Sequence, residues 1–544
     1  MHDFSIWAPN ANRLQVVVDG TPHPLQPQPN GSWHANIASA DHGSDYAFLM
    51  NDDQHPYPDP RSQWQPSGVH AASRVYDHSR FAWKTPATWS APPLADAVFY
   101  ELHIGTFTPE GTFDAAIARL PYLKELGITH VEIMPVASFP GQRGWGYDGV
   151  ALFAPQEHYG GPDGLKRLID ACHGIGLAAV LDVVYNHFGP AGNYTGIFGP
   201  YILHEYETPW GGVVNLDGEG SEQVRRFFID NALMWLRDYR FDALRLDAIH
   251  ALQDKSPVHF LSQLSSEVAA LSQQSSRPLQ LIAESDLNDP IVVTPRELGG
   301  RGMDAQWSDD FHHALHTVLT GEERGYYADF GTLEQLAKAL RSVFVYDGQD
   351  SSSRSQRHGK PVKDMPGSRF FGYIQDHDQV GNRAQGERIG AIAGIAAARV
   401  AAALVLTSPF VPLIFQGEEF AASSPFLFFA DHEDEEMRRA VSEGRKREFA
   451  AFGWTGEVPD PESPETFSRS KLNWHELDSQ QSENDHRSML EWYRKLLALR
   501  REQPALHSAD LRRVQVNFEE MGRWLVMTRD NIQVVCNFAA VPRT

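Results

Sequence analysis

Residues 178–187 read AAVLDVVYNH, an apolar run that one carboxylate interrupts and that ends in polar side chains. A strand that is apolar on both faces belongs inside a parallel sheet, where helices cover both sides. Residues 241–247, FDALRLD, form a second run of this kind and end in Arg245 and Asp247. The two stretches predict buried parallel strands with chemically useful side chains at their C-terminal ends.

The same rhythm of apolar run and amphipathic helix continues along the chain, and it predicts an α/β protein. An open, doubly wound sheet would fit the alternation too, but its glycine fingerprint is missing, because residues 104–107 after the first strand contain a single Gly. Eight strands close a (β/α)₈ barrel. The predicted strands start at Val98, Val131, Ala178, Phe241, Leu279, Met303, Phe370 and Val411.

The flanking segments have the alternation and turn residues of antiparallel β-structure. Residues 1–90 predict an N-terminal β-sandwich. The barrel would occupy 91–470 with a long aromatic insertion at 187–220, and 347–367 would be a polar, Ser- and Arg-rich loop. Residues 471–544 predict a helix followed by a C-terminal β domain, which we expect to be short or truncated.

Composition narrows the possible partners. The 544-residue chain has a formal charge of −23 and 42% hydrophobic residues. A chain this acidic is repelled by phosphate backbones and anionic lipid, so we expect no nucleic-acid and no membrane partner. The N-terminus lacks the basic and apolar regions of a signal peptide. Cys172 and Cys536 lie in unlike contexts and predict buried thiols, which suits a cytoplasmic protein.

Polar side chains gather where the predicted strands end, and in a barrel those ends line the active site. Carboxylates placed there face a desolvation cost unless they are paired or hydrated. Convergent carboxylates suit glycosidic cleavage or metal binding, and retaining cleavage needs two of them about 5–5.5 Å apart. The strand-end residues are Asp182, Asn186, His187, Arg245, Asp247, His250, Glu284, Ser285, Asp286, His377 and Asp378.

Four of these segments resemble the signature segments of the α-amylase superfamily of glycoside hydrolases. They are 182–187 (DVVYNH), 241–247 (FDALRLD), 282–284 (IAE) and 377–378 (HD), and they occur in the order typical of that superfamily. The resemblance implies that Asp247 is the nucleophile, Glu284 the general acid/base and Asp378 a stabiliser of the transition state.

The resemblance also implies the residues around these three. Arg245 would keep Asp247 ionised, since a neighbouring cation lowers a carboxylate pKa. Asp182 and Asn186 would hold the catalytic residues in place without touching substrate, although Asn186 could instead be a calcium ligand as in true amylases. We expect no metal and no cofactor. The substrate-binding residues would be Tyr147, Asp148, His187, Arg245, His250, Asp286, His377, Gln379 and Arg383.

Further segments narrow the resemblance to the malto-oligosyltrehalose trehalohydrolase family. They are 283–290 (AESDLNDP), 376–383 (DHDQVGNR), 425–432 (PFLFFADH) and 307–313 (WSDDFHH). Residues 4–9 (FSIWAP) resemble the sandwich shared with branching and debranching relatives, which implies a glycan-binding-like N-terminal domain. The substrate implied is maltooligosyl trehalose or a related α-glucan, cleaved at the α-1,4 bond next to the terminal trehalose, as in trehalose biosynthesis.

Two other functions remain open at this point. A glycogen branching or debranching enzyme would share the sandwich, the barrel and the three carboxylates, and would differ in its acceptor, which is a sugar for a transferase and water for a hydrolase. A non-catalytic glycan-binding protein would have lost one or more of the carboxylates, whereas here Asp247, Glu284 and Asp378 are all present. The sequence leaves the oligomeric state open.

Overall fold

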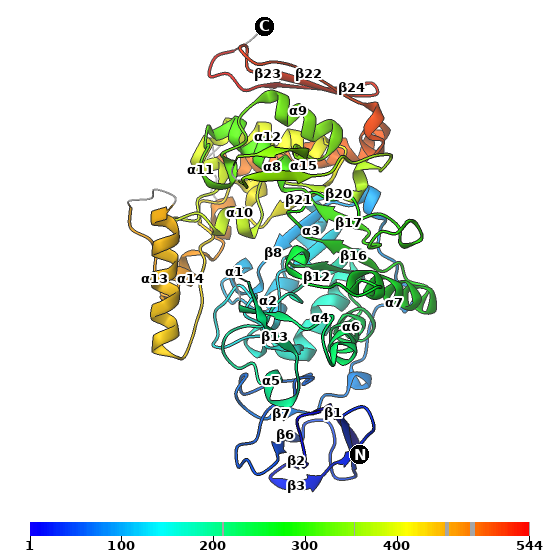
Figure 1. Ribbon diagram of the computed structural model, residues 1–544. Coiled ribbons are helices and arrows are strands. Elements are labelled where there is room, and N and C mark those ends of the chain that lie inside the picture. The colour runs from blue at the N-terminus through cyan, green and yellow to red at the C-terminus, as the bar shows by residue number, and fades with distance from the viewer. Residues whose placement is uncertain (209–210, 353, 452–455, 479–484, 543–544) are drawn as a thin grey trace.

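The computed structural model describes residues 1–208, 211–352, 354–451, 456–478 and 485–542. Figure 1 shows the β-rich N-terminal region at one end, the barrel in the middle and a small C-terminal sheet at the other end. Helix α13 (Glu435–Ala451) lies at one side of the barrel, next to α14 (Pro464–Arg469). No helix among the described residues is long and apolar enough to cross a membrane.

The N-terminal region forms two antiparallel sheets around an apolar core, as its alternating pattern predicts. One sheet is β1 (His2–Trp7), β5 (Ser32–Ile37) and β4 (Gln26–Pro27). The other is β3 (Thr21–Pro24), β2 (Leu14–Val18), β6 (Asp45–Met50) and β7 (Ser73–Arg74). In β2 every second side chain is fully buried, because successive side chains of a strand point to opposite faces.

Eight parallel strands close the barrel, so the predicted fold class is confirmed. Each strand starts within two residues of its predicted position. Around the barrel the order is β8 (Phe99–Leu102), β9 (His130–Ile133), β12 (Ala178–Val183), β15 (Ala243–Leu246), β16 (Gln280–Ala283), β17 (Ala305–Trp307), β20 (Phe370–Gly372) and β21 (Val411–Phe415). A small antiparallel pair, β10 (Ala137–Ser138) and β11 (Ala151–Pro155), follows β9.

Amphipathic helices cover the barrel. In α4, for example, Leu165, Leu168, Ile169 and Cys172 are buried on one face. The helices other than α13 and α14 are α1 (Ile104–Phe107), α2 (Phe113–Ile117), α3 (Leu120–Leu126), α4 (Gly161–Gly174), α5 (Thr195–Phe198), α6 (Ser221–Arg237), α7 (Phe260–Ser275), α8 (Asp309–Thr320), α9 (Leu333–Ser342), α10 (His377–Gly381), α11 (Ile389–Ala393), α12 (Ile395–Thr407), α15 (Asp485–Glu502) and α16 (Pro504–His507).

The aromatic insertion after β12 joins the sandwich to the barrel. It contains α5 and a hairpin of β13 (Ile202–Thr208) and β14 (Gly211–Val214), while residues 209 and 210 lie outside the described part of the chain. Phe198 belongs to the sandwich core, with its ring 6.2 Å from that of Phe48. The ring centre of Tyr201 lies 5.3 Å from that of Trp7. These aromatic rings therefore pack the domain junction.

The polar stretch after α9 is ordered as a hairpin, which the sequence did not indicate. Strands β18 (Asp347–Ser351) and β19 (Gln356–Gly359) pair antiparallel. A Cβ at Gly359 would lie 1.9 Å from the carbonyl oxygen of Tyr346. The two backbones therefore approach closely at the end of the hairpin away from the turn, where Gly359 pairs with Asp347. Composition alone suggested a loop because both faces of this hairpin are polar.

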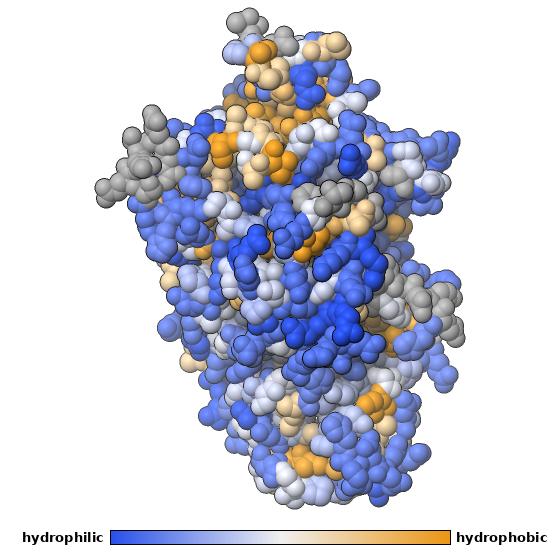
Figure 2. All heavy atoms as spheres, turned by 90° about the vertical axis from the view of Figure 1, so that its left-hand side faces the viewer, coloured by the Kyte–Doolittle hydropathy of each residue, from blue (hydrophilic) through white to orange (hydrophobic). Residues whose placement is uncertain are grey.

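The C-terminal segment folds as a helix and a β-sheet, the elements that were expected there. Strands β22 (Val514–Glu519), β23 (Trp524–Arg529) and β24 (Ile532–Asn537) form one antiparallel sheet. Figure 2 shows a largely hydrophilic face on the side of α13, with apolar residues most frequent toward the end that carries this sheet. Both cysteines are buried free thiols, Cys536 in β24 and Cys172 in α4.

A buried arginine holds the C-terminal sheet to the barrel. The Nη1 atom of Arg529 donates to the carbonyl oxygens of Thr407 and Ser408, at 2.7 Å each, and its Nη2 atom reaches that of Leu506 at 3.3 Å. The same Ser408 carbonyl accepts from Arg500 at 3.1 Å. The turn between α12 and β21 thus depends on guanidinium donors for its hydrogen bonds.

We expect Arg529→Met to lower the free energy of unfolding by about 2–3 kcal/mol, because buried carbonyls lose charged donors. Arg512→Met is the matched control, since the Arg512 side chain is 80% exposed and pairs with Asp510 on the surface. That control should stay within about 0.5 kcal/mol of the parent. Urea unfolding followed by tryptophan fluorescence measures both, and equal midpoints would refute the role given to Arg529.

Candidate active site

The strand ends bring the predicted residues to one place because neighbouring parallel strands are in register. Asp182 on β12 lies beside Arg245 on β15. One residue past β15, the backbone N–H of Asp247 donates to the carbonyl of Val183 at 3.0 Å. Glu284, directly after β16, donates its own N–H to the carbonyl of Leu246 at 3.0 Å. Asp378 lies on α10, which follows β20.

Arg245 is the centre of this arrangement. Its side chain is fully buried (0% exposed) and its guanidinium carbon lies 4.4 Å from the centre of the Trp307 ring, a cation–π contact. Nη1 lies 2.9 Å from both Asp182 Oδ2 and Asp247 Oδ1. Nη2 lies 3.3 Å from Glu284 Oε2. One buried cation therefore faces three carboxyl groups, including the predicted nucleophile and acid/base.

Asp247 is held in its ionised form. The amide Nδ2 of Asn186 donates to Asp247 Oδ2 at 2.8 Å. Burial by itself would raise the pKa of Asp247, but the charges of Arg245 and His187 and these hydrogen bonds lower it below the usual range. An ionised carboxylate with restricted rotation is what nucleophilic attack requires.

The pKa of Glu284 is shifted in the opposite direction. Burial raises the pKa of Glu284 well above its usual range; Arg245 opposes this rise, whereas the negative charges of Asp247 and Asp378 add to it. The backbone N–H of Ala248 donates to Glu284 Oε2 at 2.7 Å. Ala248 has a φ of 39°, a left-handed conformation that costs an L-residue roughly 1–2 kcal/mol. The strained turn after Asp247 thus aims a donor at its partner carboxyl.

The hydrogen-bond partners of His377 favour a proton on both ring nitrogens. Tyr147 Oη lies 2.6 Å from Asp182 Oδ2 and 2.7 Å from His377 Nε2. Burial raises the pKa of Asp182 only to about 6, so its carboxylate takes the single hydroxyl proton and Nε2 must donate to Tyr147. The other nitrogen, Nδ1, lies 2.5 Å from Glu101 Oε1 and donates to it.

The charges around His377 agree with that assignment. Burial disfavours the imidazolium, but the negative charges of Glu101 and Asp378 raise the pKa of His377 well above 6.5. Glu101 lies in β8 and also accepts the backbone N–H of His377 at 3.0 Å. The His377 ring is therefore a fixed cation, with Nε2 3.6 Å from Asp378 Oδ2.

Two further predicted residues, His187 and Tyr147, lie beside Asp247 and His377 respectively. His187 contacts Asn186 Oδ1 and, at 3.1 Å, the carbonyl of Tyr147, which places it near Asp247. Burial raises the pKa of the neighbouring Asp148. The ring of Tyr147 stacks on that of His377, with 5.1 Å between the centres.

A pocket of about 610 Å³ opens beside Asp378 and contains several predicted residues. Asp286 lines it and pairs with Arg354 of the β18–β19 hairpin at 2.8 Å, while His250 Nδ1 lies 3.9 Å from Asp286. Arg383 also lines it, but both its Nη atoms bond to Glu322 at 2.8 Å. The other lining residues are Asp309, His313, Gly321, Glu323, Arg324, Gly325, Tyr326, Tyr327, Gln379, Asn382, Ala384, Glu387 and Phe449.

Sequence reasoning missed several residues that shape the site. Glu101 looked like part of an ordinary strand, and only a carboxylate inside an apolar run could have drawn attention to it. Trp307 and Asp309 lay in a quoted motif without an assigned role. Asp309 accepts from Tyr373 at 2.5 Å, and its charge helps to raise the pKa of Glu284.

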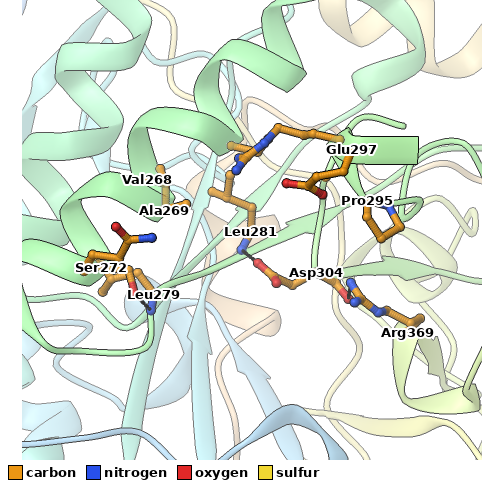
Figure 3. Close-up of a pocket in the computed structure, with 13 residues that line it drawn as sticks. Val268, Ala269, Ser272, Leu279, Leu281, Pro295, Glu297, Asp304 and Arg369 are labelled. Atoms are coloured by element: carbon orange, nitrogen blue, oxygen red, sulfur yellow. Dashed lines mark hydrogen bonds between the residues drawn. The ribbon is translucent and has the colours of Figure 1, made fainter. Parts of the chain in front are cut away.

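Neither a metal centre nor a second active site is found among the described residues. None of their His, Cys, Asp and Glu side chains form a group of three or more that could hold a metal ion, and Asn186, the calcium candidate, donates to Asp247. A second cavity of about 340 Å³ lies at the opposite end of the barrel, beside Leu279, Asp304 and Arg369, which precede the strands (Figure 3). Barrel enzymes work at the other end.

Comparison with known proteins gives the family. The family model "Alpha amylase, catalytic domain" matches residues 74–195. A malto-oligosyltrehalose trehalohydrolase from Rhizobium sp. (strain M-11) is 47% identical over 99% of this chain and 91% of its own length. This chain belongs to the malto-oligosyltrehalose trehalohydrolase family. The resemblance predicted from the sequence is thereby confirmed.

Two further matches place the trehalohydrolase family among its neighbours. The crystal structure of a putative α-amylase from Salmonella typhimurium superposes with a TM-score of 0.90 at 41% identity, covering 96% of this chain and 88% of that one. A 1,4-α-glucan branching enzyme from Shewanella baltica is 33% identical over 46% of this chain and 37% of its own length. The likeness to the trehalohydrolase family is therefore both higher and longer than the likeness to that branching enzyme.

We expect Glu101→Gln to reduce kcat/KM roughly tenfold or more at pH 7.5, because His377 loses the carboxylate that keeps it protonated. The loss should shrink toward pH 5, where His377 is protonated with or without Glu101. Initial rates of oligosaccharide hydrolysis at the two pH values measure this. Glu125→Gln is the control, since Glu125 is 71% exposed. A loss for Glu101→Gln that is independent of pH would contradict the assignment.

Proposed function

We propose that this chain is a retaining glycoside hydrolase that cleaves the α-1,4-glucosidic bond next to the terminal trehalose of maltooligosyl trehalose and releases trehalose. Membership of the trehalohydrolase family supports the substrate. The observation that carries the chemistry is the shared contact of Arg245 with Asp247 and Glu284, whose pKa values move in opposite directions. A lowered and a raised carboxyl pKa side by side supply a nucleophile and an acid.

In the first step Asp247 attacks the anomeric carbon. A bond forms from its carboxylate oxygen to that carbon, while the glycosidic bond breaks and its electrons go to the departing oxygen. Glu284 transfers its proton to this oxygen, so trehalose leaves as a neutral alcohol. Glu284 ends the step ionised, and the remaining maltooligosyl unit is an ester of Asp247.

In the second step water hydrolyses the ester. Glu284, now a base, removes a proton from water as the water oxygen attacks the anomeric carbon, and the carboxylate of Asp247 leaves. Two inversions retain the α configuration. Both side chains return to their starting protonation states, so the cycle balances without a cofactor or metal, and we propose none.

The surrounding residues act on charge and orientation. Positive charge develops on the sugar ring in the transition state, and Asp378, with 42% of its side chain exposed, is available to stabilise it. Tyr147 offers its ring to the sugar in the cleavage subsite. His187 and His377 border that subsite, with their ring nitrogens bonded to protein oxygens. Arg245 is fully buried, so it acts on substrate only through the carboxylates it contacts.

The partner we propose is therefore a neutral α-glucan with a trehalose end, and we place the enzyme in the cytoplasm, where free thiols such as Cys172 and Cys536 persist. A branching or debranching enzyme is the second candidate because the same acid and nucleophile serve it. A non-catalytic glycan-binding protein is disfavoured by the intact pair of Asp247 and Glu284.

Product analysis tests the function. Wild-type enzyme incubated with maltotriosyl trehalose should release free trehalose and maltotriose, which chromatography separates. A longer branched glucan as the main product would favour a transferase instead. Asp247→Ala should lower kcat by about 10⁴-fold or more because no ester can form. That variant should still bind oligosaccharide by calorimetry, and unchanged turnover would remove Asp247 from the mechanism.

The pH dependence of kcat/KM tests the two carboxyl roles. Activity requires ionised Asp247, so it should fall only at low pH, where this depressed pKa is reached. It also requires protonated Glu284, so it should fall again as pH rises through the raised pKa. For Glu284→Gln, a maltosyl fluoride, whose leaving group needs no proton, should react far better than the natural substrate. Equal losses on both substrates would contradict the acid role.

A further inference from the structure

Helix α13 stands at the side of the barrel, outside the ring of helices (Figure 1). One of its side chains nevertheless reaches the segment that carries Asp378. We propose that Arg445 of this helix, acting through the side-chain amide of Asn382, is a positioning residue for Asp378. The inference rests on the proposed function, in which Asp378 stabilises the transition state. It adds two residues to the reaction that the sequence motifs did not assign.

The contacts form a relay from α13 to Asp378. Arg445 Nη2 donates to Asn382 Oδ1 at 2.9 Å. Asn382 Nδ2 in turn donates to Asp378 Oδ1 at 2.9 Å. The other oxygen of Asp378 has the 3.6 Å approach of His377. The bond from Asn382 is thus the shorter of these two contacts to a side chain that is 42% exposed.

The donors and acceptors of the three groups fix the orientation of the Asn382 amide. A guanidinium has only donors, so it selects the oxygen end of the Asn382 amide. The amide nitrogen is then turned toward Asp378, and a carboxylate accepts what it offers. Without Arg445 the amide could rotate by half a turn and set its oxygen against the carboxylate, which would repel Asp378 from its position.

Arg445 is itself held rigidly. Its guanidinium carbon lies 4.8 Å from the centre of the Phe428 ring and 5.0 Å from that of Phe449. Its Nη1 atom pairs with Glu448 at 2.9 Å, and only 12% of its side chain is exposed. Phe449 also lines the pocket beside Asp378, so this part of α13 belongs to the wall of the site.

The backbone partner of Arg445 is equally constrained. Nη2 also donates to the carbonyl of Gly381 at 2.9 Å. A Cβ at Gly381 would lie 2.1 Å from the Trp145 ring, so any other residue would push the end of α10 away from that ring. Trp145 and Arg445 therefore hold the last turn of α10 from two sides, and Asn382 follows directly after it.

A double-mutant cycle tests the relay in the full-length enzyme. The variants are Arg445→Met, Asn382→Ala and the pair together, assayed with maltotriosyl trehalose. Arg447→Met is the matched control, since Arg447 lies on the same helix with 72% of its side chain exposed. We expect each single relay variant to lower kcat/KM by about tenfold, the loss expected for one hydrogen bond to a charged group.

The pair should lose no more than about threefold beyond either single variant, because both changes break the same relay. The control should stay within about twofold of wild type. Losses that multiply in the pair, or an Arg445→Met enzyme as active as the control, would overturn the proposal. If Arg445→Met does not fold, Arg445→Lys replaces it in the cycle, since lysine keeps the charge but not the fork.

Wild-type activity separates this inference from the proposed function. If wild type releases no trehalose, the proposed function fails first, and the same cycle is then run on whichever α-glucan the enzyme does cleave. If wild type releases trehalose and the relay variants match the control, only the role of Arg445 fails. Melting temperatures of all variants show whether a lost rate reflects unfolding of α13, in which case rate and stability would fall together.

Discussion

The active site depends on one buried cation. Arg245 has no exposed surface, and its guanidinium contacts Asp182, Asp247 and Glu284. A guanidinium buried alone would cost many kcal/mol, and so would the carboxylates without it. The four groups can be buried only together. The closed barrel makes that possible, because adjacent strands set Asp182 beside Arg245 and deliver Asp247 and Glu284 one residue past their ends.

The two central carboxyls share this contact but differ in the direction of their pKa shifts. Both face Arg245, so the cation alone does not distinguish them. Asp247 receives in addition the Asn186 amide and the field of His187, whereas Glu284 is exposed to the negative charges of Asp247 and Asp378. The local hydrogen bonds and neighbouring charges therefore decide which carboxyl is ionised and which keeps its proton.

Glu101 and His377 form a second buried pair of opposite charge in the barrel. Glu101 accepts from the ring and from the backbone of His377, and Tyr147 links that ring to Asp182. The two cations, Arg245 and His377, are thus joined through Tyr147 and Asp182 into one hydrogen-bonded network. Asp378 lies at the exposed edge of this network, where Asn382 and Arg445 contact it in turn.

The sequence by itself determined the barrel and the sandwich, and it placed the central carboxyls at strand ends, because each of these features rests on local pattern. Apolar runs such as 178–184 indicate burial on both faces of a strand. A polar residue at the end of such a run indicates the edge of a parallel sheet where barrel enzymes have their active sites. The eight strands therefore start close to their predicted positions. The resemblance to the family rested on the same short segments.

Only the tertiary structure decided which distant residues meet. Glu101 lies 276 positions before His377, and Asn382 lies 63 positions before Arg445, so no local pattern could pair them. The polar stretch at 347–367 became a hairpin whose Arg354 pairs with Asp286, although its composition indicated a loop. The physical reason is common to all three. Hydrogen bonds and charge pairs depend on distances of a few ångströms, and those distances exist only after the barrel has closed.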